Sequence, residues 1–170
     1  LFQSVTLRTA GFDAIGQADL NYGSKFLAII LMAIGGSPGG TAGGIKTVTI
    51  GVLVLAVISV IRGKDSIIAF KKTISISTIQ KSLAIIIMMM TLIFTATIIL
   101  TMTEKGIGIQ FDFIDILYEV SSALGTVGLS TGITSSLSFV GKIVIILCMF
   151  IGRLGPITII LALSFRKRSK

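Results

Sequence analysis

A glycine-rich segment, GGSPGGTAGGIKT at residues 35–47, contains the residue types of a phosphate-binding loop. That loop has the pattern GxxxxGK[ST], in which the lysine reaches the phosphates and the hydroxyl binds magnesium. Counted from Gly39, the match holds through Gly44, but Ile45 stands where the lysine is required. A phosphate-binding loop also follows a strand and opens a helix in water, whereas apolar runs flank this segment on both sides. We therefore expect no nucleotide site here.

Two shorter motifs contain Thr-x-Gly, TAGF at residues 9–12 and TVGL at residues 126–129. Glycine permits backbone dihedrals that leave successive carbonyls free to point the same way. Rings of such carbonyls replace the water around an ion in channel filters that read TVGYG. An ordinary helix cap and turn is the alternative interpretation. The filter hypothesis assigns ion selectivity to Thr9, Ala10, Gly11, Phe12, Thr126, Val127, Gly128 and Leu129.

The composition predicts an all-α membrane protein. Hydrophobic residues make up 53% of the 170 and charged residues only 13%, against about 25% charged in soluble domains. The apolar runs 83–102 and 143–165 each reach the roughly 20 residues that a helix needs to cross a bilayer. The runs 26–34 and 48–61 are shorter and together about one bilayer thick, so the glycine loop between them lies near mid-membrane.

Charge placement predicts the topology. Of the fifteen Lys and Arg residues behind the net charge of +8, nine lie in segments 62–81 and 166–170, while acidic residues dominate 104–119. Short basic loops stay in the cytoplasm, so the 62–81 loop and the C-terminus share the inner face, and no nucleic-acid partner is needed. Without histidine, and with Cys148 alone in an apolar run, His-based catalysis and the usual zinc spacing are absent. We expect no enzyme.

An internal repeat relates the two Thr-x-Gly motifs. At an ungapped offset of 117 residues, identical pairs include Thr9 with Thr126, Gly11 with Gly128, and Lys25 with Lys142. Each unit has an amphipathic stretch, the Thr-x-Gly turn, a polar segment and a long apolar helix. The stretch 111–124 is too short to span, so it predicts a re-entrant helix, and irregular backbone at this depth must be buried or line a watery cavity. The chain begins at such a turn, as though cut from a longer protein.

The glycine loop is either a gate beneath the filter or a close-packed kink. Arg153 aligns with Gly36 in the repeat and lies deep in the last apolar run, where a charge costs about 2.5–3.5 kcal/mol and faces a pathway or a partner. It either raises a barrier to cations, holds the glycine loop, or staples helices. Lys46 either reaches the inner interface or binds carbonyls. The gate hypothesis comprises Gly35, Gly36, Gly39, Gly40, Thr41, Ala42, Gly43, Gly44, Lys46 and Arg153.

The sequence resembles the Trk/Ktr/HKT superfamily of potassium transporters, and within it the bacterial KtrB/TrkH-like membrane subunit. Four motifs carry the resemblance: SVTLRTAGF, GGSPGGTAGGIKT, SALGTVGLSTG and GRLGPIT. The family implies four repeats of outer helix, pore helix, filter loop and inner helix around one pore. It divides this chain into the third repeat's filter and broken inner helix (1–61, with intramembrane loop 35–47), a cytoplasmic loop (62–81), the fourth repeat (82–165) and a basic tail (166–170).

The resemblance further implies potassium uptake across a bacterial plasma membrane by a multi-pass subunit with a cytoplasmic C-terminus. Potassium would pass over backbone carbonyls, with sodium coupling left open and no cofactor bound by this chain. The implied partners are the missing first two repeats, a second subunit in a homodimer, a cytoplasmic ring of nucleotide-binding regulators, and membrane lipids. Half a filter should not conduct selectively alone. The alternatives are a structural membrane subunit whose re-entrant segments only pack, and a membrane enzyme that binds phosphate.

Overall fold

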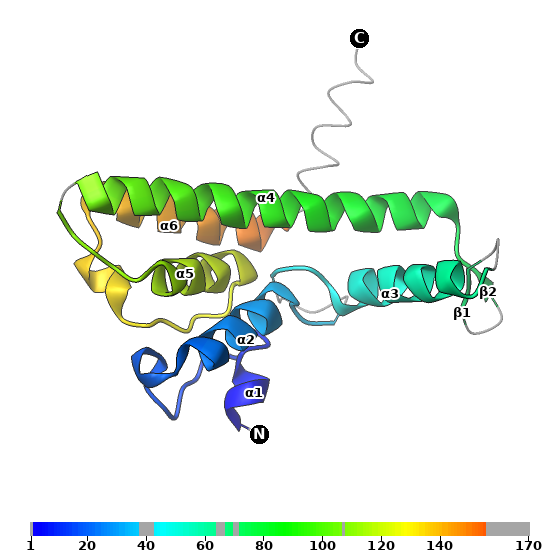
Figure 1. Cartoon of the computed structure of the whole chain (residues 1–170), viewed down its shortest axis with the longest axis horizontal. Coiled ribbons are helices and arrows are strands. Elements are labelled where there is room, and N and C mark those ends of the chain that lie inside the picture. Colours follow the sequence, from blue (N-terminus) through cyan, green and yellow to red (C-terminus); the bar gives the residue numbers. More distant parts are fainter. Residues whose placement is uncertain (1, 38–42, 64–66, 70–71, 107, 156–170) are drawn as a thin grey trace, which may run out of the picture.

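The computed structural model describes residues 2–37, 43–63, 67–69, 72–106 and 108–155, which are mainly helical (Figure 1). The all-helical prediction is thereby confirmed at the level of fold class. The helices are α1 (Phe2–Thr6), α2 (Tyr22–Ala33), α3 (Thr47–Ile61), α4 (Ile76–Gly106), α5 (Phe113–Gly125) and α6 (Phe139–Leu154), with 3-10 turns η1 (Gln17–Asp19) and η2 (Ile133–Ser136). A small antiparallel hairpin, β1 (Ile68–Ala69) with β2 (Lys72–Thr73), lies in the basic segment that the sequence predicted only as a loop.

Helix α4 is long and apolar enough to cross a membrane, and among the described residues it alone passes that test. Its 31 residues measure about 46 Å at 1.5 Å per residue, longer than the predicted run 83–102. The threonines from Thr91 onward donate their hydroxyls to carbonyls of the same helix, as when Thr97 Oγ1 donates to the carbonyl of Ile93 at 2.8 Å. Such internal hydrogen bonds let polar side chains lie in an apolar setting.

The predicted half-helices are present as α2 and α3, with 12 and 15 residues on either side of the glycine loop. The final run 143–165 differs from the prediction of one continuous span. Helix α6 ends at Leu154 because Gly155 has a φ of 76°, and Pro156, which follows in the sequence, cannot continue a helix. Residues 156–170 lie outside the described part of the chain.

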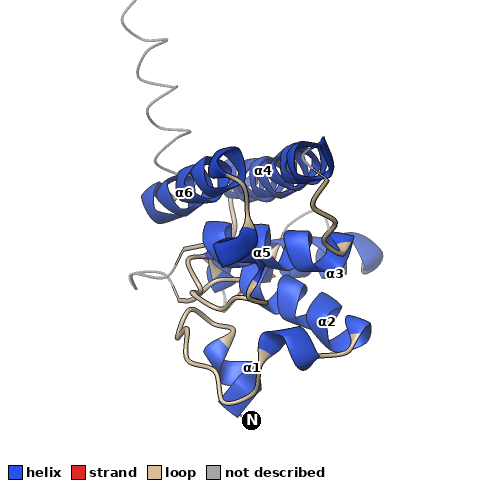
Figure 2. Cartoon of the chain, turned by 90° about the vertical axis from the view of Figure 1, so that its left-hand side faces the viewer, coloured by secondary structure: helices blue, strands red, loops and turns tan. Residues whose placement is uncertain are grey.

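Helix α5 occupies the centre of the arrangement. It packs against α2 on one side and against α4 and α6 on the other. Figure 2 shows α4 and α6 side by side above it, with α2 and α1 below. The largest buried cluster includes Met89, Leu100, Val120 and Leu124 from α4 and α5, and a second joins Met32 to Tyr118. The amphipathic stretch 111–124 therefore forms a short helix that is covered by other helices.

The sequence repeat has a structural counterpart at the same offset. Asn21 caps α2 by accepting from Ser24 N at 2.8 Å, and Ser138 caps α6 by accepting from Gly141 N at 3.0 Å. Turns η1 and η2 begin 116 residues apart, within one residue of the repeat offset, and each comes shortly before its capped helix. The inner helices α2 and α6 thus begin at equivalent positions.

Buried Glu104 joins the end of α4 to the start of α6. Its carboxylate accepts from Ser138 N at 3.1 Å and from Ser138 Oγ at 2.6 Å. The negative charge lies at the N-terminus of α6, where the helix dipole favours it. Two hydrogen bonds and a favourable charge therefore fix how these helices meet.

We predict that Glu104→Ala lowers the stability of the intact protein by about 1–3 kcal/mol, because the backbone N–H and the hydroxyl of Ser138 both lose their acceptor. Thermal unfolding in detergent measures the change. Lys105→Ala is the matched control, because Lys105 is next to Glu104 in the sequence but its side chain is exposed. Equal melting temperatures for the two variants would contradict the role given to Glu104.

Candidate functional site

The two Thr-x-Gly loops have the same unusual backbone. Thr9 and Gly11 have φ values of 67° and 76°, and Thr126 and Gly128 have 54° and 92°. Among the described residues, Thr9 and Thr126 are the non-glycine positions with positive φ. A left-handed threonine is strained by about 1–3 kcal/mol, and such strain concentrates at functional sites. The two loops therefore share positive φ at the threonine and at the glycine.

In each loop, a hydroxyl group of the preceding helix forms a hydrogen bond with the backbone of the residue that follows the glycine. Ser122 Oγ on α5 donates to the carbonyl of Leu129 at 2.6 Å. In the first unit, Phe12 N donates to Thr6 Oγ1 at 2.9 Å, and that hydroxyl donates to the carbonyl of Phe12. The residue after each filter glycine is thus tied back to its helix.

The two loops meet at their glycines. A Cβ placed on Gly11 would lie 2.5 Å from the carbonyl oxygen of Val127 and 3.7 Å from Cα of Gly128. The backbones are therefore in close contact, and no side chain fits between them. The structure thus brings Gly11 of the first predicted filter loop against Val127 and Gly128 of the second, although they lie more than one hundred positions apart.

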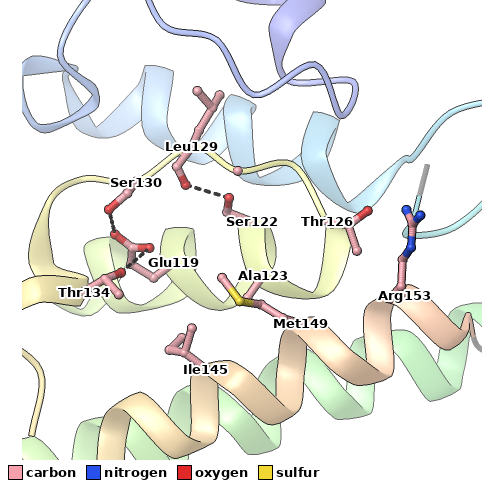
Figure 3. A pocket seen from close by; sticks show the side chains of 11 residues that line it. Glu119, Ser122, Ala123, Thr126, Leu129, Ser130, Thr134, Ile145, Met149 and Arg153 are labelled. Carbon is pink, nitrogen blue, oxygen red and sulfur yellow. Dashed lines mark hydrogen bonds between the residues drawn. The ribbon is translucent and has the colours of Figure 1, made fainter. Parts of the chain in front are cut away.

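Glu119 is a residue that the sequence analysis counted only as an external charge. Its carboxylate is buried and faces the segment that follows the second filter loop (Figure 3). Oε1 accepts from Ser130 Oγ at 2.5 Å and from Thr131 N at 3.0 Å, and Oε2 accepts from Thr134 Oγ1 at 3.0 Å. Glu119 therefore supports the exit of the loop. The sequence did contain a signal for this role, because an acidic residue on the amphipathic stretch is followed by a cluster of Ser and Thr residues.

A cavity of about 420 Å³ lies between α5, the second loop and α6. Its lining includes Thr126 and Gly128 of the loop, Glu119 behind it, and Met149 and Arg153 of α6. Figure 3 shows Arg153 beside the Thr126 end of the loop. Arg153 is exposed in the last turn of α6, where a cation is favoured by the helix dipole. The structure thus brings Arg153 to the second filter loop, at the end of a helix and not in its middle.

The ends of the glycine loop lie beneath this site. Ile34 and Ile45 form a parallel bridge, and Ile45 N donates to the carbonyl of Ala33 at 3.0 Å. Gly43 N donates to Thr126 Oγ1 at 2.8 Å, so the base of the loop is bonded to a residue that the sequence predicts for the filter. Gly39, Gly40, Thr41 and Ala42 lie outside the described residues.

The remaining gate residues lie around the two chain ends of this loop. Gly35 and Gly36 follow α2, and Thr47 N donates to the carbonyl of Gly36 at 3.3 Å. Gly44 has a φ of 71°, and half-buried Lys46 is the N-cap residue of α3. Gly35, Gly36, Gly43 and Gly44 are thereby held near one another, whereas Lys46 lies at the start of the next helix.

Carbonyl loops held between membrane-type helices define a class of ion-translocating membrane proteins. The chain matches the TrkH family model, described as a cation transport protein, over residues 1–169. It is 42% identical over 158 residues to Ktr system potassium uptake protein D of Bacillus subtilis, covering 93% of this chain and 34% of that protein. It is 38% identical over 168 residues to Ktr system potassium uptake protein B of the same organism, covering 99% and 37%.

A third relative, the potassium/sodium uptake protein NtpJ of Enterococcus hirae, is 39% identical over 165 residues, covering 95% of this chain and 36% of that protein. The chain belongs to the TrkH cation transport family, a family of transporters and not of enzymes. The resemblance to the Trk/Ktr membrane subunit is thus confirmed. The chain spans about a third of the length of the relatives it matches.

Gly43→Ala tests whether contact between the glycine loop and the filter matters. A Cβ there would lie 2.6 Å from Thr126 Oγ1, so the loop must move away from the filter. We predict changed ion flux in the full-length transporter at unchanged membrane abundance. Gly51→Ala on α3 is the control, because nothing lies within 4 Å of its Cβ. If both variants transport like the parent, the loop is a kink and not a gate.

Proposed function

We propose that this chain supplies two filter loops of a Trk/Ktr-type system that takes up potassium across a bacterial plasma membrane. The observation that carries the proposal is the shared backbone of the two loops, with positive φ at both threonines and both glycines and contact between Gly11 and Val127. The names of the relatives add support, because two are Ktr system potassium uptake proteins.

In this proposal the carbonyls of residues 9–12 and 126–129 replace water around a potassium ion. Rigid placement matters because the energy lost on dehydration is recovered only if several carbonyls reach the ion together. Ser122, Thr6 and Glu119 supply that placement through the hydrogen bonds described above. Two loops give half a ring, so other repeats of a longer polypeptide complete it.

The glycine loop and Arg153 form the gate in this proposal. The hydrogen bond from Gly43 N to Thr126 Oγ1 supports the gate assignment, because a movement of the glycine loop would displace Thr126 in the second filter loop. Arg153 lies at the same cavity, where its charge either opposes cations or holds the loop. We assign segments 1–61 and 82–165 to the third and fourth repeats, with 62–81 and 166–170 in the cytoplasm.

The proposed substrate is potassium, and sodium remains a candidate coupling ion because one relative is named a potassium/sodium uptake protein. We propose a homodimer regulated by a cytoplasmic ring of nucleotide-binding subunits, with no cofactor bound by this chain. The multi-pass subunit would keep its C-terminus in the cytoplasm. The second candidate function is a structural subunit, which the dense packing around α5 would also suit.

Gly128→Asp in the full-length transporter separates these two functions. Position 128 has a φ of 92°, which strains any L side chain, and an acidic group there would disturb the carbonyls. We predict lost potassium uptake in cells that lack their own high-affinity systems, with equal amounts of protein in the membrane. Gly106→Ala, a position with nothing within 4 Å, is the control. Normal uptake by Gly128→Asp would favour the structural subunit.

A further inference from the structure

The segment that follows each Thr-x-Gly loop is held by a buried polar side chain, and the two side chains differ in charge. In the first unit the neutral amide of Gln17, which is 1% exposed, donates from Nε2 to the carbonyl of Ile15 at 2.7 Å. In the second unit the carboxylate of Glu119, which is 5% exposed, accepts from Thr131 N at 3.0 Å. The support of one loop is therefore neutral, whereas the support of the other is negatively charged.

At the repeat offset of 117 residues, the acidic residues of the two units occupy exchanged positions. The counterpart of Glu119 is Phe2, which carries no charge. The counterpart of Ser130, whose hydroxyl donates to Glu119, is Asp13. Asp13 is exposed and directly follows the TAGF loop, as Ser130 directly follows the TVGL loop. Each unit therefore has one carboxylate at the residue that follows its loop or bonded to that residue.

The charge of Glu119 is stabilised by its neighbours but is not cancelled by them. Its hydrogen-bond donors among the described residues are hydroxyls and a backbone N–H, all of them neutral. Salt screens a charge held inside a protein much less than an exposed one. Glu119 also lines the cavity of about 420 Å³ together with Gly128 of the second loop. An anion in this position lowers the electrostatic energy of a cation at the loop.

The two ends of the second loop lie beside opposite charges. Figure 3 shows Glu119 facing Ser130, which follows the loop, and Arg153 beside Thr126, at which the loop begins. With segment 62–81 assigned to the cytoplasm, the Ser130 end of the loop faces the cell exterior. A cation that enters from outside would therefore meet negative charge before it meets positive charge.

We propose that Asp13 and Glu119 raise the affinity of the two loops for potassium, by attracting the ion to the outer end of each loop. The proposal rests on the function proposed above and assigns two side chains to the entrance of the ion path. Acidic side chains around a cation pathway raise the local concentration of cations. The exchanged positions of the two acids give each loop this attraction, although neither acid has an acidic counterpart in the other unit.

Glu119→Gln in the full-length transporter removes the charge and keeps the shape of the side chain. The amide oxygen still accepts from Thr131 N, and the hydroxyl of Thr134 can turn to accept from the new NH₂ group. We expect the KM for potassium to rise about threefold or more, and by a larger factor than Vmax falls. Initial rates of uptake by cells that lack their own high-affinity systems measure both constants.

Glu104→Gln is the matched control for this substitution. Glu104 is 1% exposed and also binds a serine hydroxyl, but it lines a different cavity at the end of α4. It should leave the KM for potassium near that of the parent. Equal changes in KM for the two variants, or a fall in Vmax alone for Glu119→Gln, would show that Glu119 is only a structural support.

A second substitution tests whether the acid can be moved to the position that it has in the first unit. Ser130 Oγ accepts from Gly132 N at 2.9 Å, a bond that an aspartate side chain also makes in turns. Adding Ser130→Asp to Glu119→Gln therefore gives the second unit the arrangement of the first. We expect the KM to return to within about twofold of the parent. Ser130→Asn in the same background is neutral and of similar shape, so equal KM values for the two double variants would overturn the proposal.

Asp13→Asn should also raise the KM for potassium, but with a different dependence on salt. Because Asp13 is exposed, its effect should shrink when choline chloride replaces sorbitol outside the cells at equal osmolarity, whereas the effect of buried Glu119 should persist. Asp19→Asn is the control, because Asp19 is an exposed acid in η1 that does not directly follow a loop. Equal changes in KM for Asp13→Asn and Asp19→Asn would indicate a general effect of surface charge and overturn the assignment of Asp13.

Comparison with Gly128→Asp separates a failure of this proposal from a failure of the proposed function. If Gly128→Asp abolishes uptake while Glu119→Gln and Asp13→Asn leave the KM unchanged, the filter assignment stands and the two acids have no part in potassium affinity. If Gly128→Asp transports normally, the proposed function fails and the entrance assigned to these acids fails with it. Lost uptake by Gly128→Asp together with raised KM values for the other two variants is the result that we expect.

Discussion

Backbone that is neither helix nor strand must find hydrogen-bond partners inside the protein wherever water is scarce. The two Thr-x-Gly loops meet this constraint with side chains of neighbouring residues. Thr6 and Ser122 bond the residue after each glycine, and Glu119 bonds the segment after the second loop. The shape of the candidate filter therefore depends on a few buried hydroxyls and one carboxylate.

Helix α5 holds these partners in position. It carries Glu119 and Ser122, and it contacts α2, α4 and α6. Small residues make the contacts close, since a Cβ on Gly125 or Gly152 would meet the backbone of Met32 or Leu124. Because the same helix also reaches the first unit through Asp115, the two filter loops are fixed relative to each other. The base of the glycine loop is joined to the second of these loops by the hydrogen bond from Gly43 N to Thr126 Oγ1.

Much of the fold could be predicted from the sequence, because the lengths of apolar runs, glycine-rich segments and an internal repeat are visible in it. The half-helices around residues 35–47, the short helix at 111–124 and the repeat all follow from local features. The hydrogen bonds of Glu104, Glu119 and Gly43 could not be predicted from the sequence. Their partners lie 11 to 83 positions away, and the packing of the helices determines which groups meet. For the apolar run 143–165, the sequence predicted one continuous helix, but the structure shows that the helix ends before Gly155. Hydrophobicity alone does not reveal this end.

We propose that the loops 9–12 and 126–129 face one ion. Rubidium is a heavier analogue of potassium, and its anomalous scattering can be located in crystals of the full-length transporter. We predict a peak bounded by carbonyl oxygens of both loops, with the rest of the ring of carbonyls supplied by other repeats. Rubidium peaks found only away from these two loops would contradict this assignment.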